Sequence, residues 1–191
     1  KSLDPDAYLC QLADIFNSIT VHTPSVSAII AIVLAGVLLL ASGFASASEI
    51  AFFSLSPSDR NDIDERNHPS DEKISALLGD SERLLATILI TNNFVNVTII
   101  MLCNFFFMNV FIFHSPLAEF LILTVILTFM LLLFGEIMPK IYSAQKTLAF
   151  CRFSAPGIYY LEKIFRPVAT VLVRSTAFLN KHFAKKSHNI S

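Results

Sequence analysis

The 191-residue sequence has no tryptophan, three cysteines and five glycines. Three cysteines (Cys10, Cys103 and Cys151) cannot supply the framework of a small disulfide-rich protein. The sequence also lacks a G-x-x-x-x-G-K-[ST] phosphate loop and an H-E-x-x-H zinc pair, so nothing in it indicates nucleotide hydrolysis or a zinc protease. No Ser/His or Ser/Lys dyad falls within an apolar run. We therefore expect that the protein is not an enzyme.

Three long runs of the chain are almost free of charge. Residues 26–48 and 84–113 contain no charged side chain, and residues 116–138 contain only Glu119 and Glu136, one near each end. A membrane-spanning helix needs about 20 mainly apolar residues. The alternative is a large buried helical core, but three such runs in so short a chain leave too little polar surface to cover them. We predict an all-α membrane protein with three transmembrane helices and short juxtamembrane amphipathic helices.

The basic residues are distributed unevenly, although the net charge is only −1. Of 14 lysines and arginines, only Lys1 lies outside residues 54–83 and 139–191, and the segment IFHSP between the second and third runs has none. Loops rich in Lys and Arg stay in the cytoplasm. We expect an integral protein in the lipid bilayer of the bacterial inner (cytoplasmic) membrane, with the N-terminus outside and the C-terminus cytoplasmic.

An alternative for the first run is a cleaved signal peptide, because LLLASGFASASE ends in small residues as a cleavage site does. A signal peptide begins with a positively charged segment, whereas the residues before this run carry three aspartates and one lysine. Because the charge has the wrong sign, we favour a membrane span.

The remaining segments are shorter and more polar. After the third run, aromatic and basic residues alternate without a charge-free stretch of spanning length, which is typical of helices in the headgroup region; a soluble cytoplasmic bundle is the alternative. We expect Pro156 and Pro167 to break this segment into shorter pieces. The predicted organisation is an external segment at 1–25, a transmembrane domain at 26–186 with spans at about 26–53, 84–113 and 117–138 and juxtamembrane helices at about 56–83 and 140–186, and a tail at 187–191.

Polar side chains recur along the first two runs at intervals that place them on one helix face. Ser42, Ser46 and Glu49 are four and three residues apart, and Asn92, Asn96 and Asn104 are four and eight apart. Buried amides and hydroxyls cost free energy unless they have partners. These faces should therefore meet inside a bundle or line a wet cavity, where they either hold helices together or form a binding site.

The third run carries LLLFGEIMPK near its end. Glu136 is an ionisable residue at membrane depth, and such a residue is by default a functional hypothesis. Pro139 has no amide proton and cannot bond the carbonyl of Gly135, four residues earlier. A free carbonyl inside a membrane is tolerated where it lines a cavity or binds an ion. The alternative for Glu136 is an interfacial carboxylate paired with Lys140.

The candidate groups are hydroxyl, amide and carbonyl oxygens with one or two carboxylates, and they include no thiolate or imidazole. Ligand sets made only of oxygen suit hard cations such as Mg²⁺, Ca²⁺ or Na⁺. Residue spacing does not choose among these ions and does not by itself indicate transport.

Three stretches, SGFASASEIAFFSLS, LLATILITNNFVN and FGEIMPK, resemble the transmembrane domain of the CorC/CNNM family, also called the DUF21 domain. The resemblance covers about residues 20–185, and its specificity comes from three motifs in order, each in the expected span. It implies three transmembrane helices with a belt of juxtamembrane helices, in a homodimer whose protomers each have an ion site. Members of this family are associated with Mg²⁺ export and with Na⁺/Mg²⁺ exchange.

The same resemblance implies a role for each matching residue. The implied metal ligands are the hydroxyls of Ser42 and Ser46, an amide oxygen of Asn92 or Asn96, the Gly135 carbonyl and the Glu136 carboxylate. Pro139 matches the proline that breaks the third helix, and Glu49 matches a secondary polar position on a Na⁺ route. The choice between Asn92 and Asn96 stays open.

The sequence departs from the family pattern in two ways. Family members usually continue into a cytoplasmic CBS-domain pair that binds nucleotide, and this sequence contains none, so we expect an excised membrane domain. The long N-terminal segment is similar to the gliding-motility-associated branch. The expected function is a membrane cation transporter that exports Mg²⁺, with Na⁺/Mg²⁺ exchange as one form of it. The alternative is a non-transporting scaffold or ion-sensing subunit of a gliding or secretion apparatus, and neither hypothesis involves nucleic acid.

Overall fold

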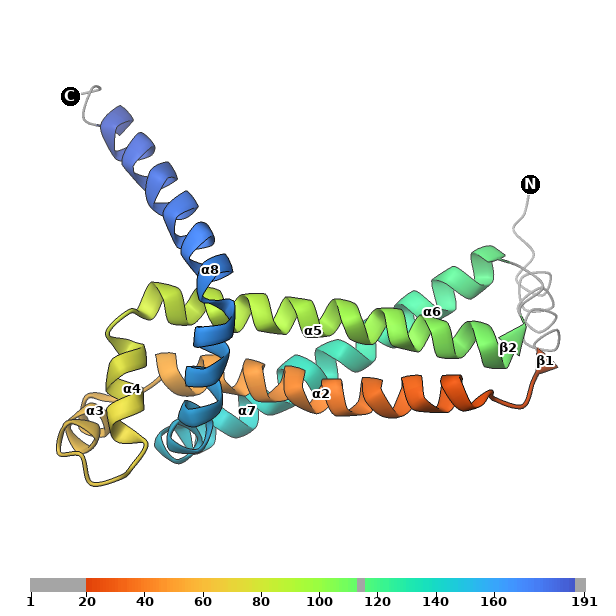
Figure 1. Ribbon diagram of the computed structural model, residues 1–191, viewed down its shortest axis with the longest axis horizontal. Coiled ribbons are helices and arrows are strands. Elements are labelled where there is room, and N and C mark those ends of the chain that lie inside the picture. The colour runs from red at the N-terminus through yellow and green to blue at the C-terminus, as the bar shows by residue number, and fades with distance from the viewer. Residues whose placement is uncertain (1–19, 113–115, 188–191) are drawn as a thin grey trace, which may run out of the picture.

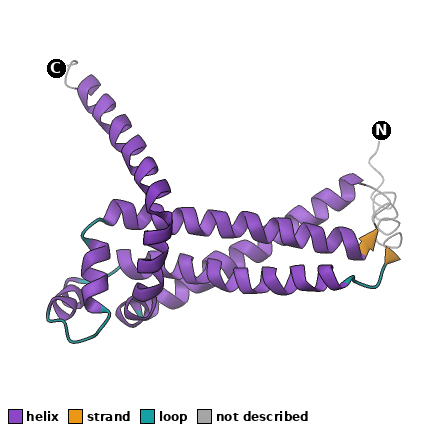
Figure 2. Cartoon of the chain, viewed as in Figure 1, coloured by secondary structure: helices purple, strands orange, loops and turns teal. Residues whose placement is uncertain are grey.

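The computed structural model describes residues 20–112 and 116–187. Three long helical segments run side by side in an elongated bundle (Figure 1). The segments Val26–Phe53, Ser81–Val110 and Glu119–Gln145 are long and apolar enough to cross a membrane. The prediction of a helical protein with three spans is confirmed, and Figure 2 shows that nearly all of the described chain is helix. Residues 1–19 of the predicted external segment lie outside the described residues.

The elements follow one another in a simple order. The first two long helices are α2 (Val26–Phe53) and α5 (Ser81–Val110), and α3 (Pro57–Asp64) and α4 (Asp71–Leu78) lie between them. The third segment is composite: α6 (Pro116–Met130), the π-helical turn η1 (Leu131–Ile137) and α7 (Met138–Gln145). It is followed by α8 (Thr147–Ser187). At the other end of the bundle, β1 (Thr20–Val21) pairs antiparallel with β2 (Phe111–Ile112).

Side-chain caps define where the helices begin. The Ser25 hydroxyl accepts from the backbone N–H of Ala28 at the start of α2, and the Asp80 carboxylate does the same for Arg83 at the start of α5. A capping box formed by Ser56 and Asp59 opens α3. Each cap satisfies a backbone donor that has no partner inside its helix. These helices thus begin at positions that the sequence specifies locally.

Small residues on α2 allow the end of the third segment to approach closely. A Cβ atom at Gly43 would lie 3.0 Å from Cγ of Pro139, so a side chain at this position would press against the proline ring. One turn further, the buried Ser143 hydroxyl of α7 donates to the Ala47 carbonyl of α2 at 2.6 Å. Close backbone approach at small residues is the usual way in which helices pack within membranes. Because of it, α7 lies directly against α2.

The C-terminal segment is one continuous helix, so the prediction that Pro156 and Pro167 break it is wrong. Both prolines lie inside α8, which crosses the bundle and then leads away from it (Figure 1). A proline removes one backbone hydrogen bond and bends a helix. Around Pro156 the loss is offset by packing, because Cys151, Ala155 and Ile158 are completely buried against the core.

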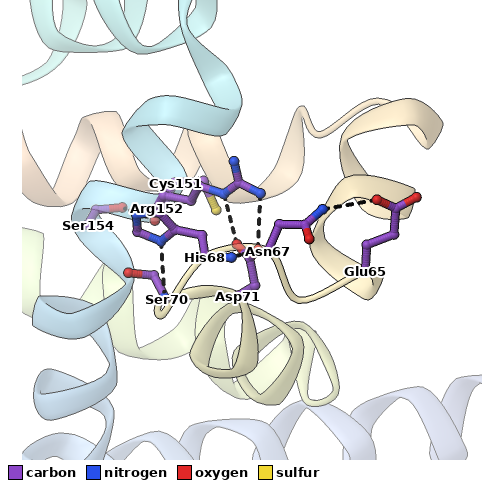
Figure 3. A network of polar contacts seen from close by, with 8 residues as sticks. All are labelled: Glu65, Asn67, His68, Ser70, Asp71, Cys151, Arg152 and Ser154. Carbon is purple, nitrogen blue, oxygen red and sulfur yellow. Dashed lines mark hydrogen bonds and ion pairs between the residues drawn. The ribbon is translucent and has the colours of Figure 1, made fainter.

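A buried ion pair joins α4 to α8 at the end of the bundle opposite β1 and β2 (Figures 1 and 3). The Arg152 guanidinium donates to both carboxylate oxygens of Asp71, at 2.8 and 3.0 Å, and the backbone N–H of His68 donates to the same carboxylate. Burial alone would raise the pKa of Asp71, but the bonds from Arg152 and His68 hold it below its ordinary value of 3.8. In this network the charged groups of Asp71 and Arg152 have each other as partners.

The outward faces of the three spans are apolar. Large hydrophobic side chains are exposed along all of them, among them Val33, Leu40, Phe94, Phe120 and Val125. A soluble monomer rarely exposes so much contiguous apolar surface, whereas a lipid environment is suited to it. The exposed apolar faces therefore agree with the assignment of the chain as an integral membrane protein.

Candidate metal centre

Four of the predicted site residues meet between α2 and α5. The hydroxyl of Ser42 lies 2.8 Å from Oδ1 of Asn92 and 2.6 Å from Oδ1 of Asn96. The Ser46 hydroxyl lies 3.4 Å from the same Asn92 oxygen. Both serines are completely buried, and both asparagines are partly buried. The geometry therefore requires no choice between Asn92 and Asn96, because both amide oxygens contact the Ser42 hydroxyl.

The cluster has fewer protons than oxygen–oxygen contacts. Each hydroxyl carries one proton, and an amide oxygen carries none. With the amide oxygens turned toward the serines, two protons, from Ser42 and Ser46, serve three contacts, so one pair of oxygens is in contact without a proton between them. Oxygens held this close without a bridging proton repel one another. A cation placed among them replaces that repulsion with coordination.

Gly135 brings the third segment against the same serine. A Cβ atom at Gly135 would lie 3.2 Å from Oγ of Ser42, closer than ordinary van der Waals contact. The glycine is buried and lies in η1, the π-helical turn. Such turns occur frequently at functional sites. The structure thus places residues of three helical segments, α2, α5 and η1, around the Ser42 hydroxyl.

The π-helical hydrogen bonding of η1 changes which backbone carbonyl lacks an N–H donor because residue 139 is proline. Met138 donates to the carbonyl of Leu133, five residues back. Continued by one residue, this register would pair residue 139 with Phe134, and proline cannot make that bond. The Phe134 carbonyl oxygen would be 3.4 Å from a Cβ atom at Gly43, so it faces α2. The sequence indicated that Pro139 would leave the Gly135 carbonyl without a donor, because that expectation assumes α-helical hydrogen bonds between residues four apart. Only the folded chain reveals the π turn, in which the bonds join residues five apart.

The structure bears on one of the two interpretations of Glu136, its ion pair with Lys140. Lys140 forms its ion pair with Glu49 of α2, with Nζ 3.0 Å from Oε2. Glu136 is partly buried and makes no hydrogen bond or ion pair with any residue in the described part of the chain. The alternative Glu136–Lys140 pair is therefore wrong, and Glu49 has a partner of its own. An unpaired carboxylate next to Gly135 remains.

Other polar groups of the second span lie outside this cluster. The Thr91 and Thr98 hydroxyls donate to carbonyls of their own helix, so neither hydroxyl donates a hydrogen bond to another helix. Asn104 shares a helix face with Asn92 and Asn96 but lines a different cavity, together with Glu119 of α6. Sequence reasoning did not associate Asn104 with Glu119, because the two residues belong to different helices and no local pattern relates them.

The donor set of the cluster fits a hard cation. Its members are neutral oxygens, and within residues 20–112 and 116–187 no group of three or more His, Cys, Asp or Glu gathers. Two ligands at right angles around Mg²⁺, each about 2.05 Å from the ion, lie about 2.9 Å apart. The separations of 2.6 and 2.8 Å at Ser42 are near that value.

Comparison with known proteins gives two findings. Residues 32–191 match the family described as the cyclin M transmembrane N-terminal domain. Among curated proteins, the UPF0053 protein of Haemophilus influenzae is 31% identical to this chain over 134 residues. The matched region is 70% of this chain and 31% of the relative, so the chain spans less than a third of that protein's length.

Proposed function

Because this chain belongs to the cyclin M (CNNM) transmembrane family, a family associated with membrane cation transport, we propose that it exports Mg²⁺ through the cluster at Ser42. The observation that carries the proposal is the convergence of the Asn92 and Asn96 oxygens on the Ser42 hydroxyl, at 2.8 and 2.6 Å, with too few protons to satisfy the cluster. The proposed ligands are Ser42, Ser46, Asn92, Asn96, the Gly135 carbonyl and Glu136.

The proposed mechanism begins with replacement of the ion's water shell. Mg²⁺ prefers octahedral oxygen ligands and gives up its waters reluctantly. Buried hydroxyl and amide oxygens supply part of that octahedron, and the Glu136 carboxylate offsets part of the charge in a medium where an unpaired ion is costly. Alternating access then follows from movement of the third segment, since Gly135 and Pro139 make its helix irregular where it touches α2.

Other parts of the proposal concern the surroundings of the chain. We place β1 and β2 outside the cell and α3, α4 and the start of α8 in the cytoplasm of a bacterial inner membrane, because the basic residues gather at the latter end. We propose a homodimer and, in a longer protein, a cytoplasmic CBS-domain pair. Na⁺ is the proposed counter-ion, since no phosphate loop is present in the sequence.

The first test is cation-dependent stability of the purified chain in detergent. Mg²⁺ at 100 times its dissociation constant should stabilise the folded protein by about 2.7 kcal/mol. We expect Mg²⁺ to raise the thermal unfolding midpoint more than Na⁺ or K⁺, with Ca²⁺ as the divalent comparison. Glu136→Ala should lose the response to Mg²⁺. Glu72→Ala, which removes an exposed carboxylate from α4, should keep it.

Flux into liposomes then separates transport from a scaffold role. The scaffold hypothesis has support of its own, because the contacts between Ser42 and the two asparagines also join α2 to α5. A transporter moves Mg²⁺ across the bilayer, faster with an opposing Na⁺ gradient, and Glu136→Ala abolishes the movement. Binding without flux would favour an ion-sensing scaffold. If each ion shifts the unfolding midpoints of wild type and Glu136→Ala equally, Glu136 is not a ligand.

A further inference from the structure

The second half of α8 has an exposed apolar face. This helix crosses the bundle near the end opposite β1 and β2 and then leads away from the spans (Figure 1). Four of its large apolar side chains, those of Tyr160, Ile164, Val168 and Val171, are 52–67% exposed. At about 100° per residue, these four positions fall within an arc of about 80°. They form one stripe along the helix, which we call the apolar stripe.

Three basic side chains lie on another face of the same part of α8. Lys163, Arg166 and Arg174 are exposed, and by the same count they lie about 110° around the helix from the apolar stripe. Within the described residues, none of the three forms an ion pair. Lys163 lies over the Tyr159 ring, with Nζ 4.8 Å from the ring centroid. These three positive charges therefore have no carboxylate partner in the part of the chain that the structure describes.

The third face of this segment packs beside the second span. Ala169 is completely buried, and the Phe165 ring lies 6.5 Å from the ring of Phe94 in α5. Phe94 lies within the charge-free run at residues 84–113. The contact holds this part of α8 next to a segment of α5 that is long and apolar enough to cross a membrane. The apolar stripe therefore lies beside lipid tails rather than in open water.

The charge of this segment indicates what surface it can bind. From residue 160 to residue 187 the sequence has six Lys and Arg and one Glu, a net charge of +5. Residues 54–83 have eight Asp and Glu and four Lys and Arg, a net charge of −4. The same segment of α8 in a second copy of the chain would repel it. Anionic lipids attract basic clusters that adjoin a membrane span.

We propose that α8 from Tyr160 onward binds anionic phospholipids, with its apolar stripe among the acyl chains and Lys163, Arg166 and Arg174 at the headgroup phosphates. The long apolar stems of Lys and Arg stay beside the lipid tails while their charged ends reach the phosphates. Helices with separate apolar and basic faces lie in the plane of the interface, and anionic lipids strengthen their binding. The inference is independent of cation binding by the Ser42 cluster.

The first experiment measures the lipid preference of the full chain in a neutral detergent. Phosphatidylglycerol and phosphatidylcholine, each with a fluorophore on one acyl chain, are titrated with protein, and fluorescence anisotropy reports binding. Wild type should bind phosphatidylglycerol at least about tenfold more tightly, since each basic residue near an anionic surface contributes about fivefold. The triple variant Lys163→Gln/Arg166→Gln/Arg174→Gln should lose this preference.

A matched variant and a salt titration control for the change in charge and for misfolding. Arg60→Gln/Arg66→Gln/Lys73→Gln removes three positive charges from residues 54–83 and should keep the wild-type preference. Salt at about 1 M screens exposed charges beyond about 3 Å, so it should abolish the preference of wild type without any substitution. Equal binding of the two lipids by wild type at low salt overturns the inference, and so does a preference that the α8 triple variant retains.

The second experiment tests the apolar stripe and uses the lack of tryptophan in the sequence. Ile164→Trp places a single tryptophan on the stripe, and Asn61→Trp places one on the exposed surface of α3. In vesicles of phosphatidylglycerol and phosphatidylcholine with brominated acyl chains, fluorescence of the Ile164→Trp protein should be quenched, and that of the Asn61→Trp protein should not. If neither is quenched, protein covers the stripe, as the acidic residues 54–83 of a second copy could, and the inference is overturned.

Discussion

The Asp71–Arg152 network and the Ser42 cluster both bury polar groups, but they satisfy them differently. Asp71 is completely buried; both of its carboxylate oxygens accept bonds from Arg152, and one of them also accepts from the backbone N–H of His68 (Figure 3). Around Ser42, two hydroxyl protons serve three oxygen contacts. The Glu136 carboxylate nearby makes no bond within the described residues. In the first network each carboxylate oxygen has a donor, and in the second the oxygen contacts outnumber the hydroxyl protons.

This difference suggests how polar groups can be sorted by role. A charge that finds its partner within the chain holds two elements together, as the Asp71–Arg152 pair holds α4 to α8. Oxygen atoms held close together with too few protons raise the free energy of the ion-free protein, and a bound cation would lower it. Removing a partner should therefore change stability in the first network and cation response in the second.

The largest expected effect is on the Asp71–Arg152 network. Asp71→Asn leaves the Arg152 guanidinium without its carboxylate in a partly buried position. Removing one member of a buried ion pair typically destabilises a protein by about 3 kcal/mol or more. We expect the thermal unfolding midpoint to fall markedly, with or without Mg²⁺. Asp64→Asn at the exposed end of α3 is the control and should change stability by less than about 0.5 kcal/mol. Equal midpoints for the two variants would mean that the ion pair is not structural.

A smaller and more specific effect is expected at the Ser42 cluster. Ser42→Ala removes the hydroxyl that both asparagines contact, so most of the stabilisation by Mg²⁺, about 2.7 kcal/mol at 100 times the dissociation constant, should disappear. Ser48→Ala is an unusually close control, since Ser48 is equally buried on the same helix but donates to the Phe44 carbonyl of that helix. Titrating the unfolding midpoint with Mg²⁺ compares them. Identical titrations would remove Ser42 from the site.

The smallest expected effect is the pH dependence of the stability difference between wild type and Asp71→Asn. The pKa of Asp71 is lowered in the folded protein, because the bonds from Arg152 and His68 outweigh the effect of burial. Its contribution to stability is therefore fully present above the unfolded value of 3.8 and is lost as the pH falls through the lower folded value. The difference in unfolding midpoint between wild type and Asp71→Asn should be constant near neutral pH and shrink below about pH 4. A difference that grows below about pH 4 would contradict a lowered pKa of Asp71 in the folded protein.

Some of the molecule could be predicted because the relevant signals are local. Charge-free runs of sufficient length indicate spans wherever they occur. The interval of four between Ser42 and Ser46, and between Asn92 and Asn96, is enough by itself to place each pair on one helix face. Helix breaks were harder to predict, since the effect of Pro156 depends on how well Cys151, Ala155 and Ile158 pack against the core.

By itself the sequence determined the three spans, the polar face of each helix and the oxygen character of the donors, because these depend on residue type and helical period alone. Only the tertiary structure decided that Lys140 pairs with Glu49, that both asparagines reach Ser42, and that Asn104 shares a cavity with Glu119. The physical reason is the distance along the chain. Ser42 and Asn92 are 50 residues apart, and their contact depends on how α2 and α5 are rotated and shifted against each other. That arrangement is set by packing over the whole length of the helices, at small residues such as Gly43 and Gly135.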